Sequence, residues 1–233
     1  MNRFLTNSAQ PPLRVALLDA EQGILDGYHF RLDPLYHIHI VAEALTGAEF
    51  EEQLAQRPAD VALLGLLAPA APDNPAAYPL VHAIPRLRQH YPGLAILVVA
   101  HLADPQQIHT LIEAGARGYL VKSDAGIYPA LSQILVSVAH GGVYYSPTAE
   151  AALRQHDPEA AGPRVLSRRQ LQAVALCAAY PRRTLHDIAQ EMDVSASTVR
   201  NLLSQAYQRL NVASRAEAVL RAQQLGLLPR ERT

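Results

Sequence analysis

The sequence predicts two domains of different class: an α/β domain with a doubly wound parallel sheet, followed by a smaller all-helical domain. Three observations support this prediction. The 233 residues exceed the usual size of one domain. Short apolar runs alternate with helix-length segments in the first 140 residues, and only helical periodicity follows residue 164. Charge divides along the same boundary, with acidic residues in excess before it and arginines after it.

The α/β domain is predicted from five short apolar runs. Runs of this kind are typical of strands that are buried on both faces of a sheet. Because strand and helix alternate five times, we expect five parallel strands in one sheet with helices on both faces. The strands are predicted at 15–18, 38–42, 61–64, 96–100 and 119–121, and the helices at 24–32, 48–56, 78–90, 106–113 and 128–140.

Breaks in the pattern set the boundaries of the domains. The first twelve residues are polar, end in a proline pair and show no periodicity, which predicts a loose tail. Glycines and prolines interrupt the helical pattern after residue 140, and a second group of them lies in 154–164. We therefore predict a tail at 1–12, an α/β domain at 13–140, a linker at 141–163 and a helical domain at 164–233.

The distribution of charge favours a nucleic-acid partner. The net charge is only −1, but residues 164–233 contain 11 arginines and 5 acidic residues, a balance of +6. The preceding part carries 9 basic and 16 acidic residues, a balance of −7. A basic module joined to an acidic one indicates that the helical domain binds phosphates. No apolar run has the length of a membrane span, so we expect a cytoplasmic protein without membrane contact.

Cysteine and histidine point to no redox or metal site. Cys177 is the only cysteine and lies in an apolar helical stretch, which predicts a buried thiol. The ten histidines include His37 and His39, two apart on a predicted strand, and His101, but no spacing matches a zinc site. We therefore expect no cofactor and no metal.

A helix-turn-helix is predicted in the helical domain. Thr184 and Asp187 have the spacing of a capping box that begins the first helix. Asp193 lies where the chain must turn sharply, and Asp tolerates left-handed geometry better than most residues. Ser195 is then expected to cap the second helix.

The second helix has one apolar and one polar face. At helical periodicity, four apolar residues from Val199 to Leu210 form a stripe that is expected to be buried. The opposite face carries short polar side chains that can reach base edges, with an arginine suited to phosphate or guanine. A solvent-exposed face on an ordinary three-helix bundle is the alternative that this helix leaves open. The polar residues are Ser197, Asn201, Ser204 and Gln208, flanked by Arg200 and Gln205.

The helical domain resembles the LuxR/NarL type of DNA-binding domain across nearly all of 165–228. Matching positions occur in Leu166–Gln170, Asp187–Glu191, Ser195–Asn201, Arg209–Val212 and Arg215–Val219. In that family the second helix enters the major groove of double-stranded DNA, and the module usually reads paired half-sites as a dimer. The resemblance therefore implies double-stranded DNA as partner, a homodimer, and DNA contacts by Ser197, Thr198, Arg200, Asn201, Ser204, Gln205, Gln208 and Arg215.

Two departures from the family pattern concern this domain. The loop at 180–183 is longer than usual, and Leu202 stands where the family usually has histidine. The second departure leaves the operator sequence undetermined.

The α/β domain resembles the receiver domain of NarL-type response regulators. Matching segments are Arg14–Asp19, Arg57–Leu64 and Ala114–Lys122. The resemblance implies a flavodoxin-like sheet, in which the reactive crevice lies beyond the carboxyl ends of the strands.

The receiver chemistry is incomplete in this chain. It needs a carboxylate nucleophile, an acid pair for magnesium, a hydroxyl for the phosphoryl group and a lysine. Asp19 matches one acid and Lys122 the cation, but Ala20 stands at the second acid position. Gly65 occupies the nucleophile position and Ala100 the hydroxyl position, which predicts a domain unable to be phosphorylated. The crevice remnant then comprises Asp19, Glu21, Gly65, Ala100, His101, Tyr119 and Lys122.

Two interpretations of this remnant stay open. Asp19 and Lys122 can form a residual ion pair that only stabilises the crevice. Alternatively, the crevice is a repurposed pocket for a small ligand or a protein partner. The loop at 66–78 is longer than the family pattern and rich in proline, and it is able to cover or fill the site. Asp73 in this loop is a conceivable but poorly aligned substitute phosphoacceptor.

Together these features predict a DNA-binding transcriptional regulator that acts without aspartyl phosphorylation. The receiver half would serve dimerisation, ligand sensing or partner sensing. The alternative is a ligand-sensing or protein-interaction module whose DNA binding is incidental. We predict no enzyme activity, because the crevice lacks a nucleophile beside a base and the chain lacks a Gly-rich phosphate loop.

Overall fold

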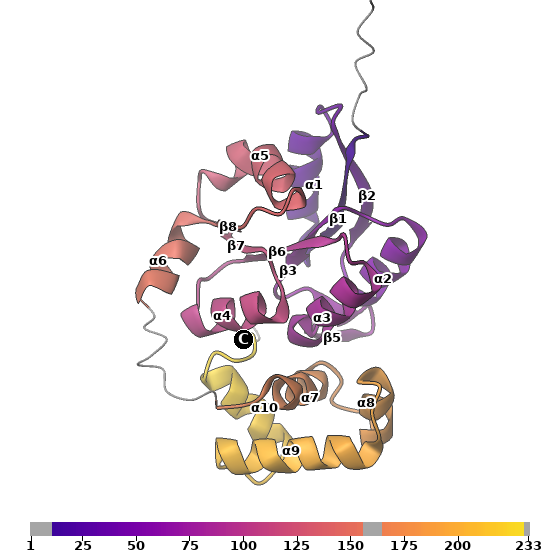
Figure 1. Ribbon diagram of the computed structural model, residues 1–233, viewed down its shortest axis with the longest axis vertical. Helices are drawn as coiled ribbons and strands as arrows, with labels where there is room; N and C mark the ends of the chain where they lie inside the picture. The colour runs from indigo at the N-terminus through magenta and orange to yellow at the C-terminus, as the bar shows by residue number, and fades with distance from the viewer. Residues whose placement is uncertain (1–10, 156–164, 231–233) are drawn as a thin grey trace, which may run out of the picture.

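The structure, a computed structural model, describes residues 11–155 and 165–230 and contains an α/β domain and a helical domain (Figure 1). The predicted tail lies almost wholly outside the described residues, as does the end of the predicted linker. The α/β domain is built on one parallel sheet. Its strands lie in the order β2 (Ile38–Ala44), β1 (Leu13–Leu18), β3 (Val61–Gly65), β6 (Ala95–Ala100), β7 (Gly118–Val121) and β8 (Tyr144–Tyr145).

Helices cover both faces of this sheet and create two separate apolar cores (Figure 1). Along β1, Val15 and Leu17 point into one core and Ala16 and Leu18 into the other, as alternation along a strand requires. This arrangement confirms the predicted doubly wound, flavodoxin-like fold. The helices are α1 (Gln22–Leu32) and α5 (Ile127–Ala139) on one face, and α2 (Gly47–Gln56), α3 (Leu80–His90) and α4 (Pro105–Ala114) on the other.

The sheet has six strands where five were predicted. Strand β8 comes from the segment predicted as linker, and the helix after it, α6 (Pro147–Gln155), packs on α4. The buried Ser146 Oγ accepts a hydrogen bond from Val121 N at 3.0 Å and ties this segment to β7. A strand of two residues is too short to produce a periodic pattern, which explains why the sequence did not indicate it.

The proline-rich insertion forms a β-hairpin. Its strands, β4 (Pro69–Ala71) and β5 (Asn74–Ala77), pair antiparallel and form a sheet of their own. Asp73 lies in the exposed turn between them. Prolines are tolerated here because a two-stranded ribbon consists of edge strands, which need fewer backbone donors.

The helical domain contains the predicted helix-turn-helix. Thr184 and Asp187 form the capping box, and Asp193 has a left-handed backbone with φ of 53°. The Ser195 side chain accepts a hydrogen bond from Thr198 N at 3.1 Å. The apolar stripe is buried as expected, with Val199, Leu203, Ala206 and Leu210 at most 4% exposed. The helices are α7 (Arg168–Ala179), α8 (Leu185–Glu191), α9 (Ala196–Leu210) and α10 (Arg215–Gln224).

The two domains dock through α7, which packs on α3 and on β5. Asn74 of the hairpin donates a hydrogen bond from Nδ2 to Ala179 O at 2.7 Å. Next to this contact, Glu191 Oε1 lies 3.6 Å from His82 Nε2, and Glu191 Oε2 accepts from Arg183 Nη1 at 2.9 Å. Figure 1 shows α9 on the side of the helical domain that faces away from the sheet. Docking therefore leaves the second helix of the helix-turn-helix open.

No helix among residues 11–155 and 165–230 has the length and apolar character that crossing a membrane requires.

Candidate nucleic-acid interface and receiver crevice

The outer face of α9 forms a continuous polar surface. All seven α9 residues that were predicted to bind DNA are exposed. Two of them join the helix cap, because the hydroxyls of Ser197 and Thr198 each lie 2.8 Å from Ser195 Oγ. Gln205 Oε1 accepts a hydrogen bond from Gln170 Nε2 of α7 at 3.0 Å. Side chains at both ends of the face are thus pre-positioned, and those between them are open to solvent.

The helical domain carries several exposed arginines. Five of them make no ion pair with any residue in the described part of the chain, so their charge is available to phosphate groups. Arg200 lies on α9 beside the polar face, and Arg209 lies near its end. Only Arg200 among these was predicted from the sequence to bind DNA. The set is Arg168, Arg169, Arg182, Arg200 and Arg209.

Arg215 differs from the other predicted DNA-binding residues. Its guanidinium turns inward and donates to Tyr180 O at 2.7 Å, Arg183 O at 2.8 Å and Cys177 O at 3.4 Å. These carbonyls belong to the end of α7 and to the loop at 180–183. Arg215 therefore connects α10 to this loop, a role that the local sequence around it did not indicate.

In the receiver crevice, Lys122 lies between two carboxylates. Its ammonium donates to Asp19 Oδ1 at 2.9 Å, contacts Oδ2 at 2.8 Å, and reaches Glu21 Oε1 at 3.1 Å. His101 Nε2 lies 2.7 Å from the same Glu21 oxygen. His101 and then Lys122 lower the pKa of Glu21 by binding its charged form. Asp19 is 2% exposed, so Lys122 is the counter-charge of a buried acid.

A side chain at the nucleophile position, Gly65, would be tightly confined. A Cβ built on it would lie 3.0 Å from Leu18 O and 3.2 Å from both Cα and Oδ2 of Asp19. Two of these neighbours are backbone atoms, which cannot move without shifting β1. A Cβ at position 65 would therefore require Leu18 or Asp19 to move by a few tenths of an ångström.

Six of the seven predicted crevice residues line one cleft with a volume of about 820 Å³. The exception is Tyr119, which is 1% exposed and donates its hydroxyl to Leu102 O at 2.8 Å. Burial raises the pKa of the Tyr119 phenol. The six residues that the structure brings together are Asp19, Glu21, Gly65, Ala100, His101 and Lys122.

Cys177 is 3% exposed, and burial raises its pKa to about 11, which makes its thiol inert at neutral pH. Among the described residues, no three His, Cys, Asp or Glu side chains group in a way that could hold a metal ion. His37 and His39 are both exposed on or beside β2.

Sequence comparisons place known regulators close to this chain. A family model for region 4 of sigma-70 matches residues 164–211. The chain is similar to the transcriptional regulatory protein DesR of Bacillus subtilis (strain 168), with 26% identity over 92% of this chain and 98% of DesR. It is also similar to the oxygen regulatory protein NreC of Staphylococcus carnosus (strain TM300), with 24% identity over 89% of this chain and 95% of NreC.

Solved structures of a bacterial response regulator share the fold. RcsB from Salmonella enterica serovar Typhimurium, bound to promoter rprA with the phosphomimetic BeF3-, matches with a TM-score of 0.59 and 18% identity. That match covers 90% of this chain and 98% of the RcsB chain. A structure of two RcsB dimers bound to two parallel DNAs matches with a TM-score of 0.55 and 17% identity, over 91% and 98% of the two chains.

Proposed function

We propose that this chain, which belongs to the LuxR/NarL family of response regulators, is a DNA-binding transcriptional regulator that acts without aspartyl phosphorylation. The DNA-binding part of this proposal is supported by the open polar face of α9, together with Arg200 and Arg209 on the same helix, which lack ion-pair partners among the described residues. Such a face suits base edges, and such arginines suit phosphates on either side of the groove. Ser197, Thr198, Asn201, Ser204, Gln205 and Gln208 are the side chains that we assign to the groove.

Replacing Arg200 with alanine should weaken DNA binding by about fivefold or more. It should also reduce the slope of log affinity against log salt concentration by about one unit. The reason is the loss of one cation at the edge of the groove. Fluorescence anisotropy of labelled genomic fragments at several salt concentrations measures both quantities. The matched control is Arg57→Ala in the exposed end of the receiver helix α2, which should change neither. Unchanged affinity and slope for Arg200→Ala would contradict this docking of α9.

Three positions in the receiver half support regulation without phosphorylation. Gly65 offers no carboxylate, Ala100 offers no hydroxyl, and the Lys122 ammonium is held by Asp19 and Glu21. Asp73 is exposed in the hairpin turn and is not among the residues that line the crevice cleft. A ligand shifts the equilibrium between two conformations only if it binds them with different affinity. The crevice supplies neither the carboxylate nor the hydroxyl that a phosphoryl group needs, so phosphorylation is not expected to shift this domain.

Acetyl phosphate, or beryllofluoride with magnesium, should therefore leave DNA affinity and oligomeric state unchanged. Size-exclusion chromatography and anisotropy with and without each reagent test this. Gly65→Asp alone should not restore a response, because its Cβ meets the backbone of β1 and Ala20 still supplies no second acid. A phosphate-dependent mobility shift in the unmodified protein that Asp73→Ala abolishes would instead make the hairpin turn the phosphoacceptor.

We further propose a cytoplasmic homodimer on paired half-sites. The reason is the resemblance of the helical domain to a module that usually reads paired half-sites as a dimer. The receiver half then serves dimerisation or the sensing of a ligand or partner. The competing function, an interaction module with incidental DNA binding, predicts no preference among genomic fragments in a gel-shift assay, whereas a regulator should select particular fragments.

A further inference from the structure

We propose that the cleft between the two domains is a binding site for a small, uncharged, mostly apolar molecule that carries one amide or hydroxyl group. This inference deepens the ligand-sensing part of the proposed function by naming the class of ligand, while direct binding to the cleft does not depend on how the protein regulates transcription. Only its effect on DNA binding would rest on that function.

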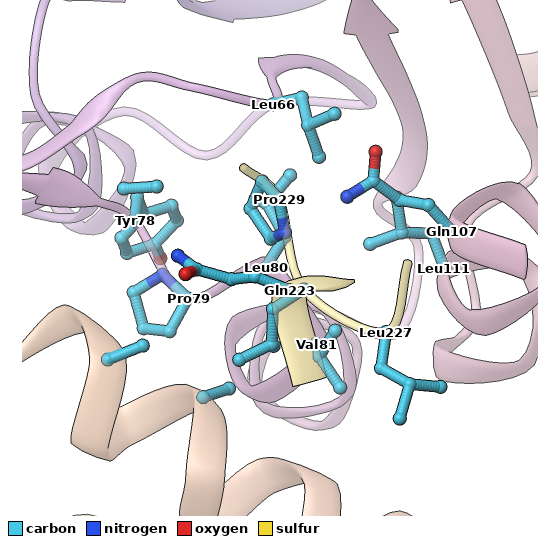
Figure 2. Close-up of a pocket in the computed structure, with 14 residues that line it drawn as sticks. Leu66, Tyr78, Pro79, Leu80, Val81, Gln107, Leu111, Gln223, Leu227 and Pro229 are labelled. Carbon is cyan, nitrogen blue, oxygen red and sulfur yellow. The ribbon is translucent and has the colours of Figure 1, made fainter. Parts of the chain in front are cut away.

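Both domains and the inserted hairpin contribute walls to this cleft. Leu66 and Ala77 lie at the two ends of the hairpin, and Leu228 and Pro229 belong to the segment that follows α10. A smaller apolar pocket adjoins the cleft and shares these residues with it (Figure 2). A volume of about 820 Å³ is within the range of small-molecule sites, which favour domain interfaces with mainly apolar walls.

Two side-chain amides occupy the boundary between the cleft and the adjoining pocket. Gln107 of α4 is 8% exposed, and its carboxamide makes no hydrogen bond with a residue in the described part of the chain. The side-chain amide of Gln223, on α10, is likewise without such a partner. Figure 2 shows the Gln107 amide directed into the space that Leu66 and Pro229 border. A ligand that hydrogen-bonds these amides while it covers the apolar walls would be favoured over one that covers the walls and leaves the amides without a partner.

The charged groups around the cleft already have partners. Asp19 and Glu21 share the single Lys122 ammonium, and His101 Nε2 contacts Glu21. Asp104 Oδ1 accepts from the backbone of α4 at 3.0 Å. The Arg230 guanidinium donates to the carbonyls of residues 223 and 224 at 3.2 Å and 3.0 Å. An anionic ligand would have to displace a carboxylate from Lys122 or a carbonyl from Arg230, so the site favours a ligand without negative charge.

A molecule in this position would contact both domains at once. Its binding free energy would stabilise the docked arrangement, in which α7 packs on α3 and on the hairpin, because only this arrangement brings Gln107 and Gln223 to one cleft. The geometry thus links ligand binding to the docking of the DNA-binding domain.

Two fluorinated probes that differ in one polar group can test the site on the full chain. 4-Fluoroacetanilide carries an amide, whereas 1-ethyl-4-fluorobenzene has a similar ring without one. ¹⁹F NMR titration should show both probes binding. Gln107→Leu, or Gln223→Leu from the other domain, should weaken the anilide by about threefold to tenfold and leave the hydrocarbon unchanged. Gln223 is only partly buried, so its variant remains informative if Gln107→Leu does not fold.

The matched control is Gln133→Leu, an exposed position on α5, which should alter neither titration. Absence of any ¹⁹F shift or broadening up to the solubility of both probes would overturn the proposal, as would equal weakening of both probes by the glutamine variants. DNA affinity is measured separately on the same samples. A protein that binds DNA but neither probe lacks this site, while one that binds the probes but no DNA lacks the proposed function.

Discussion

Replacement of Lys122 by methionine should lower the free energy of unfolding of the α/β domain by about 3–5 kcal/mol. The side chains of Lys122 and Asp19 are 8% and 2% exposed, and the ammonium is the ion-pair partner of the buried acid. Removing it leaves a carboxylate in the protein interior without a counter-charge, and the nearby Glu21 adds repulsion. Urea unfolding of the full chain, followed by circular dichroism, measures the change.

The double variant Asp19→Asn/Lys122→Met should regain most of the lost stability, because the uncompensated charge is then gone. Arg14→Met is the matched control. It breaks the pair of Arg14 with Asp60 at 2.7 Å, whose side chains are 48% and 36% exposed, and should cost less than about 1 kcal/mol. A similar small loss for Lys122→Met would show that the crevice pair contributes little, and that water reaches Asp19.

Arg215→Ala should destabilise the helical domain by about 2–3 kcal/mol, because three carbonyls lose a charged donor at once. The loop at 180–183 is the part that we expect to loosen, and hydrogen exchange of that segment should rise along with the loss in urea unfolding. DNA affinity should fall because the loop at 180–183 loses its fixed conformation, and the slope of log affinity against log salt concentration should stay the same.

Arg221→Ala, on the same helix, is the control for Arg215→Ala. Among residues 11–155 and 165–230, its guanidinium makes one hydrogen bond, to Gln224 Oε1 at 3.3 Å. The residue is exposed, so stability should stay within about 0.5 kcal/mol. The resemblance to the LuxR/NarL type implies instead that Arg215 contacts DNA. Full stability of Arg215→Ala, combined with a salt slope reduced by one unit, would favour that DNA contact over the structural role.

The helix-turn-helix was predictable because its determinants are local. The capping box of Thr184 and Asp187 spans four residues, and the turn at Asp193 depends on the backbone preference of one residue. The open face of α9 follows from helical periodicity in the same way. Arg215 was less predictable, since its acceptors lie 32 to 38 residues away and its own surroundings match the family pattern.

The sequence by itself determined the two domain classes, the order of the main strands and helices, and the absence of a carboxylate at Gly65. Each depends on periodicity or on the identity of one residue. The tertiary structure decided that Lys122 binds both Asp19 and Glu21, more than 100 residues away, and that the hairpin reaches Ala179 through Asn74. Such contacts form between single side chains whose pairing depends on how the chain folds back, and no local pattern in the sequence records them.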